Sequence, residues 1–122
     1  MRILLIGDKN TESDIYSMID QILAEDKVIE SHDIDESLSY LSDQVYDLIF
    51  INYNSERIEN GDFQVIFEVR CKTQAPMLVI MAPCGIRDKL HVLNMRADDY
   101  IERPINKREF KEKILLLLNR LP

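Results

Sequence analysis

The chain has 122 residues with 22 acidic and 15 basic side chains, which gives it a formal charge of -7. This length predicts one domain, and 46% hydrophobic with 30% charged residues excludes a disordered or collagen-like chain. The acidic balance excludes strong binding to nucleic acid or to an anionic membrane through this chain alone. The acidity is uneven, because residues 1–60 hold 14 acidic and 4 basic side chains and residues 61–122 hold 8 and 11.

The two cysteines and the short apolar runs indicate in which cellular compartment the protein is found. Cys71 lies in a helical pattern and Cys84 follows a proline, which favours two free thiols in a reducing environment. The first apolar run meets Asp8 and Lys9 before a signal-peptide core could form, and no run approaches the roughly 18 residues of a membrane span. We expect a cytoplasmic protein with no membrane partner.

Short apolar runs alternate with helical patterns in chain order. Strands are expected at residues 3–6, 28–29, 48–51, 77–81 and 100–101. After each strand, apolar residues recur at helical spacing, which predicts helices at residues 15–23, 38–41, 63–70 and 90–93. A capping-box pattern at 106–109 predicts the start of the last helix.

The strand runs at 3–6, 48–51 and 77–81 are continuously apolar, which is typical of central parallel strands covered on both faces. Five strand–helix pairs predict an α/β fold with a doubly wound, five-stranded parallel sheet, five helices and flavodoxin-like topology. In such folds the chemistry lies at the carboxyl ends of the strands. Asp47 precedes a strand and is therefore expected at the opposite end of the sheet.

Four segments carry a family resemblance: Tyr46–Asn52, Asn60–Gly61, Pro76–Ala82 and Ala97–Pro104. Together they resemble the receiver domain of bacterial two-component response regulators, the CheY-like fold, over essentially the whole chain. The last segment, Ala-Asp-Asp-Tyr-Ile-x-basic-Pro, is most similar to the OmpR/PhoB branch, whose members carry a winged-helix DNA-binding domain after the receiver. The resemblance implies that residues 1–122 are the N-terminal receiver domain of a longer response regulator, with the DNA-binding domain absent from this chain.

In that family an aspartate after the third strand accepts a phosphoryl group, and two acids after the first strand hold Mg²⁺. Asn52 stands at the phosphoacceptor position, and an amide offers no anionic oxygen to attack phosphorus. Gly7 replaces the first metal-binding acid and leaves Asp8 alone, which is too little anionic oxygen for a hard cation. We therefore expect no catalytic residue, no metal site, no cofactor and weak or absent Mg²⁺ binding.

Two further family positions are also changed. Met81 replaces the hydroxyl that turns toward the phosphoryl group, and Arg103 replaces the lysine that contacts it. Arg103 is expected to pair with Asp8 or to bind a stray anion, and the resemblance implies a cis bond between Arg103 and Pro104. His32 and His91 have no ligand spacing, so no zinc site is expected.

The resemblance also implies a symmetric dimer through the fourth helix, the fifth strand and the fifth helix. An apolar centre of Leu90 and Leu93 is expected there, flanked by three charge pairs across the two-fold axis: Lys89 with Glu109, Asp99 with Lys113, and Asp98 with Arg120. Glu112 stands where the family has a small apolar residue, which predicts a modest or altered dimer. The alternative interpretation is that these charges form solvated helix faces, with Glu109 and Lys113 an ordinary i,i+4 pair.

Two single positions complete the resemblance. Tyr100 matches the aromatic side chain that swings inward on activation, and with Met81 beside it we expect one fixed rotamer. Arg96 stands where the family has a helix-ending glycine in the left-handed conformation.

These expectations favour an atypical, phosphorylation-independent receiver domain that supplies dimerisation and regulation to a two-component DNA-binding transcription factor, and that is itself no enzyme. Two alternatives remain open: a stand-alone interaction module that binds another signalling protein through the same face, and a conventional phosphorelay receiver. A flavin site is disfavoured because the segment after the first strand carries two acids and lacks a phosphate-binding glycine-rich loop.

Overall fold

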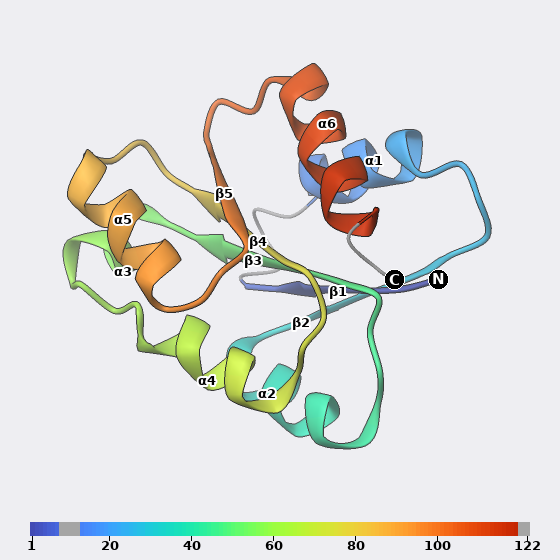
Figure 1. Ribbon diagram of the computed structural model, residues 1–122, viewed down its shortest axis with the longest axis horizontal. Coiled ribbons are helices and arrows are strands. Elements are labelled where there is room, and N and C mark those ends of the chain that lie inside the picture. The colour runs from blue at the N-terminus through green and yellow to red at the C-terminus, as the bar shows by residue number, and fades with distance from the viewer. Residues whose placement is uncertain (8–12, 120–122) are drawn as a thin grey trace.

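A five-stranded parallel sheet with helices on both faces forms the computed structural model (Figure 1), which describes residues 1–7 and 13–119. The strands lie in the order β2-β1-β3-β4-β5, the doubly wound order that the sequence predicts. The strands are β1 (Arg2–Ile6), β2 (Val28–His32), β3 (Leu48–Tyr53), β4 (Met77–Met81) and β5 (Asp99–Glu102). The helices are α1 (Ser13–Ile22), α2 (Ile34–Asp43), α3 (Ser55–Glu59), α4 (Gln64–Lys72), α5 (Ile86–Asn94) and α6 (Lys107–Leu118).

The predicted fold class is confirmed, but the predicted number of helices is wrong. The described residues form six helices, and the additional one is α3, a single turn directly after β3. The Asn54 side chain caps it by accepting a hydrogen bond from the Arg57 backbone N–H, and Ile58 anchors it in the core. Five residues are too few to show a helical repeat of apolar side chains, so the sequence pattern does not reveal this helix.

Other helix starts follow the capping chemistry of the sequence. The Asn106 side chain accepts a hydrogen bond from the backbone N–H of Glu109, as the capping-box pattern predicts. Asp33 caps α2 in the same way through the N–H of Glu36. These caps set the directions in which the chain leaves the carboxyl end of the sheet.

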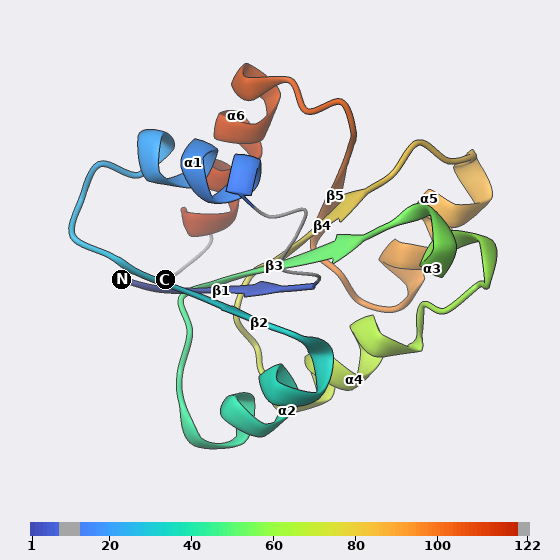
Figure 2. The same cartoon turned by 180° about the vertical axis from the view of Figure 1, so that it is seen from behind.

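Helices cover both faces of the sheet (Figures 1 and 2), and one apolar cluster lies on each face. Helices α1 and α6 cover one face, where Phe50 packs with Phe110. Helices α2, α4 and α5 lie on the other side, where Tyr53 and Met81 belong to the buried cluster. Because successive side chains of a strand point to opposite faces, each central strand supplies both clusters and reads as a continuous apolar run.

Two backbone features expected from the family resemblance are present. The peptide bond between Arg103 and Pro104 is cis. Arg96, just after α5, has a φ of 78°, the left-handed conformation that favours glycine. Asp47 also lies as predicted, because its carboxylate accepts a hydrogen bond from the backbone N–H of Arg2 at the start of β1, far from the carboxyl ends of the strands.

Candidate functional site

The strand register brings the positions that the resemblance singles out to one edge of the sheet. Ile6 pairs with Ile51 and Met81 pairs with Glu102, so Gly7, Asn52, Met81 and Arg103 all lie at the carboxyl ends of neighbouring strands. Asp8, the remaining acid of the predicted site, lies outside the described residues. The edge therefore gathers the positions expected from the resemblance.

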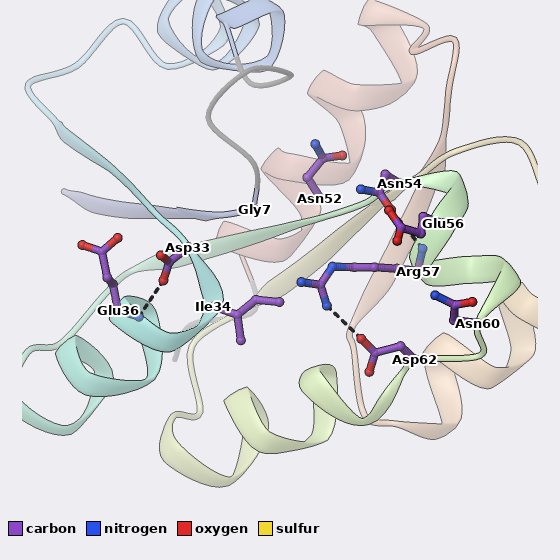
Figure 3. Close-up of a pocket in the computed structure, with 10 residues that line it drawn as sticks. All are labelled: Gly7, Asp33, Ile34, Glu36, Asn52, Asn54, Glu56, Arg57, Asn60 and Asp62. Carbon is purple, nitrogen blue, oxygen red and sulfur yellow. Dashed lines mark hydrogen bonds and ion pairs between the residues drawn. The ribbon is translucent and has the colours of Figure 1, made fainter.

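Asn52 and Met81 are directed to opposite faces of the sheet. Asn52 alternates with Tyr53, whose side chain is fully buried in the cluster on the side of α2, α4 and α5. In Figure 3 the Asn52 side chain points away from Ile34 and Arg57. Met81 is also fully buried, in the same cluster as Tyr53, and the half-buried Tyr100 packs against this cluster. The position of the family's hydroxyl is therefore filled by an apolar thioether packed into the core.

Arg103 forms an ion pair that the sequence analysis missed. Its Nη1 atom lies 3.0 Å from the Oδ2 atom of Asp14 in the first turn of α1, and both side chains are partly exposed. The two residues are 89 positions apart in the chain, so only the packing of α1 against the edge of the sheet brings them together. The predicted pair with Asp8 lies outside the described residues.

A pocket of about 640 Å³ lies beside this edge, between α2 and the segment around α3 (Figure 3). The Arg57 guanidinium pairs with Asp62 at 2.9 Å across it. Polar and charged side chains dominate its lining, which consists of Gly7, Asp33, Ile34, Glu36, Asn52, Asn54, Glu56, Arg57, Asn60 and Asp62. Four carboxylates against one guanidinium make the pocket a poor binding site for a phosphate anion.

The described residues hold no group of three His, Cys, Asp or Glu side chains that could bind a metal ion. Because Asp8 is not among them, weak or absent Mg²⁺ binding stays a prediction. His91 lies exposed on α5, where its ring packs on Phe63 with the ring centroids 4.5 Å apart.

Glu102, at the end of β5, is a second residue that the sequence analysis missed. Its Oε2 atom accepts a hydrogen bond from the Cys84 backbone N–H at 3.2 Å and lies 3.0 Å from Nζ of Lys89. The hydrogen bond with Lys89 is the main reason that the pKa of Glu102 lies below its usual range. The same contact raises the pKa of Lys89. Glu102 occupies the variable position of the Ala-Asp-Asp-Tyr-Ile-x-basic-Pro motif, so its role depends on contacts that the motif does not encode.

The charges expected at a dimer interface have partners inside this chain. Lys89 pairs with Glu102, and Lys113 lies 3.2 Å from Asp99 and 3.8 Å from Glu109. Arg120 lies outside the described residues. Pairing across a dimer stays a prediction, and each such pair would compete with an internal one.

Asp98 is held by a network that joins three elements. Its Oδ2 atom lies 2.8 Å from Nη2 of Arg70 on α4 and accepts the backbone N–H of Met77 at 2.7 Å. Arg70 also donates to the backbone oxygens of Ala75 and Arg96. Arg70 ends the helical pattern predicted at residues 63–70, but the sequence indicates no role for it because its partners are distant in the chain.

Apolar side chains remain exposed on α5 and α6. Leu90 is 54% exposed, and Ile86 and Leu93 lie near it at helical spacing. On α6, Leu116 is 65% exposed and follows Lys113 by three residues, which places it on the β5 side of that helix. We call Ile86, Leu90, Leu93 and Leu116 the apolar face. Tyr100 is half-buried beside it, with Nζ of Lys113 5.1 Å from its ring centroid.

Comparison with known proteins agrees with this architecture. No protein-family model matches the chain. It is 31% identical over 122 residues to the transcriptional regulatory protein CiaR of Streptococcus pneumoniae. The aligned region covers 98% of this chain and 52% of CiaR. It is 29% identical over 121 residues to the transcriptional regulatory protein CpxR of Klebsiella pneumoniae, covering 98% of this chain and 50% of CpxR.

A crystal structure of a two-component response regulator from Clostridium difficile superposes with a TM-score of 0.79 at 23% identity, covering 99% of this chain and 98% of that one. This likeness shows the fold. The chain has the CheY-like fold that this response regulator shows, and the curated proteins to which it is similar are transcriptional regulators. It spans about half the length of the curated relatives that it matches. No helix within residues 1–7 and 13–119 is long and apolar enough to cross a membrane.

Proposed function

We propose that this chain is an atypical receiver domain that works without phosphorylation and supplies dimerisation and regulation to a DNA-binding transcription factor in the cytoplasm. The similarity to one half of two transcriptional regulators supports an output domain elsewhere in the native polypeptide. The proposed homodimer forms through the apolar face, and contact with DNA comes only through that other domain.

The observation that carries the proposal is that Asn52 and the buried Met81 both lie at the edge of the sheet where the family performs its chemistry. An amide cannot form an acyl phosphate, and a methionine packed into the core cannot turn a hydroxyl toward one. Arg103 is engaged by Asp14 at 3.0 Å, which further supports a site that is not organised around a phosphoryl group. The domain is therefore regulatory and has no enzymatic role.

Beryllofluoride, a mimic of the aspartyl phosphate, tests the site directly. We expect that Mg²⁺ with beryllofluoride leaves the amide NMR signals of Gly7, Asn52 and Arg103 unshifted, while sedimentation shows a dimer with and without the mimic. Saturable shifts at these residues together with a change from monomer to dimer would establish a conventional phosphorelay receiver. The Asn52→Asp variant is the matched control, and we expect it to stay unlabelled by a small phosphodonor because Gly7 and Met81 are unchanged.

A stand-alone interaction module is the second candidate, favoured by the internal pairing of Lys89 and Lys113, which weakens the electrostatic case for a dimer. The length of the native polypeptide decides between the two. A reading frame that ends near residue 122, combined with a monomer in sedimentation, supports the interaction module.

A further inference from the structure

Residues 82–85 connect β4 to α5 and thus link the degenerate site to the apolar face. The Ala82 backbone N–H donates to the carbonyl of Tyr53 at 3.0 Å, which ties the start of this loop to β3. A pocket of about 390 Å³ lies between α3 and the rest of the loop, lined on the side opposite α3 by Pro83 and Cys84 of the loop and by Asp88 of α5. Helix α3 therefore does not pack closely against this side of the loop.

Glu102 holds the loop from the opposite side. One carboxylate oxygen accepts from the Cys84 backbone N–H at 3.2 Å and lies 3.0 Å from the Lys89 ammonium, so it joins β5 both to the loop and to α5. Gly85, at the N-cap of α5, has no side chain to cap the helix. A carboxylate near the N-terminus of a helix is also favoured by the helix dipole.

We infer that Glu102 is a built-in clamp that holds the β4–α5 loop and α5 in a single arrangement. Hydrogen bonds to an ionised group are stronger than neutral ones, and here two segments share one acceptor. Met81, fully buried at the end of β4, offers no hydroxyl whose hydrogen bonding could favour a second arrangement. The clamp is inferred from the contacts of Glu102 with Cys84 and Lys89. Its effect on self-association depends on the proposed function.

Amide hydrogen exchange at Cys84 measures the clamp in the folded domain. We expect the Glu102→Ala variant to exchange the Cys84 amide on the order of tenfold faster than the unmodified protein, because a charge-assisted hydrogen bond is lost. The Glu102→Gln variant should show an intermediate rate, since its amide oxygen still accepts from Cys84 but no longer pairs with Lys89. Glu68→Ala, at an exposed glutamate of α4, is the matched control and should change nothing.

Relaxation dispersion on the same samples reports loop rearrangement on the microsecond-to-millisecond timescale. Signals of residues 82–90 should be free of exchange broadening in the unmodified protein and broadened in Glu102→Ala. Equal Cys84 exchange rates and equal line shapes in the unmodified protein and Glu102→Ala would overturn the clamp. Far-ultraviolet circular dichroism confirms that each variant is folded.

Sedimentation of the same variants separates the two proposals. If the unmodified domain dimerises, Glu102→Ala should weaken the dimer several-fold, because α5 no longer presents the apolar face in one arrangement. A faster Cys84 amide in Glu102→Ala with a monomer at all concentrations supports the clamp and overturns the proposed dimer. A stable dimer in which Glu102→Ala leaves the exchange rate of the Cys84 amide unchanged supports the proposed dimer and overturns the clamp.

Discussion

Cys71 lies exposed on α4, whereas Cys84 is half-buried in the loop before α5. Burial raises the pKa of the Cys84 thiol, and the nearby carboxylates of Asp88 and Glu102 raise it further. Since the thiolate is the reactive form, position and charge both slow reactions of Cys84. Two residues of one type therefore differ in reactivity because of their tertiary surroundings.

The difference is measurable with an aromatic disulfide reagent at pH 7.5. We expect Cys71 to react on the order of tenfold faster than Cys84 in the native domain. The Cys71→Ser variant should keep only the slow phase, and Cys84→Ser only the fast one. Equal rates in these two variants would contradict the assignment.

Titration of Glu102 gives a second test at this scale. Because the pKa of Glu102 is lowered, its carboxylate stabilises the fold above its ordinary pKa, and this contribution is lost as the pH falls through the lowered value. Because the pKa of Lys89 is raised, its ammonium stabilises the fold below its ordinary pKa, and this contribution is lost as the pH rises through the raised value. The contact is therefore complete between about pH 4.3 and pH 10.4, the ordinary pKa values of the two side chains. We expect the Lys89→Met variant to raise the pKa of Glu102 toward its ordinary value, as measured by carboxyl ¹³C NMR. An unchanged pKa would show that Lys89 is not its cause.

At the scale of elements, Arg70 joins the end of α4 to the chain before β4 and to the turn before β5. Its side chain is only 11% exposed, and its guanidinium reaches the Asp98 carboxylate as well as the carbonyl oxygens of Thr73, Ala75 and Arg96. The contact with Arg96 falls at the left-handed residue that ends α5, so the same side chain also braces that turn.

Removing this guanidinium should destabilise the domain. We expect Arg70→Met to lower the free energy of unfolding by about 1–3 kcal/mol, because the partly buried Asp98 carboxylate and three carbonyls lose a shared donor. Urea unfolding measures the change. The matched control is Arg108→Met, at a side chain 90% exposed that pairs with Glu112 at 3.7 Å, where about 0.5 kcal/mol or less is expected. Similar losses in the two variants would refute this role of Arg70.

For the whole molecule, two exposed leucines on different sides of α6 allow the proposed interface to be tested against an ordinary surface. Leu116 belongs to the apolar face, whereas its neighbour Leu115 is 41% exposed on a different side of the helix, four residues after Lys111. Both side chains are outside the buried core, so an acidic replacement of either one should leave the fold intact.

We expect Leu116→Asp to weaken self-association at least tenfold and Leu115→Asp to leave it unchanged, because only the first puts a charge into the proposed interface. Sedimentation over a range of concentrations measures this. Equal effects of the two substitutions would place the interface elsewhere or show that aggregation, rather than a defined dimer, is being observed.

The sequence was sufficient to predict the strands, their parallel arrangement and which residues lie at the carboxyl ends of the strands. Three central strands are continuously apolar because the sheet is covered on both faces, and the segment at 97–104 fixes the position of Arg103 and the cis bond before Pro104. These features depend on local backbone geometry or on a contiguous motif. They can therefore be predicted without knowledge of distant contacts.

Only the tertiary structure decided which charges meet. Nothing in the sequence pattern indicated that Lys89 meets Glu102 or that Arg103 meets Asp14, 89 residues away. It also gave no signal for α3 or for the network around Arg70. The physical reason is that charged side chains are long and surface-exposed, so their partners depend on how separate elements pack, whereas the apolar periodicity of each element depends on its own backbone geometry.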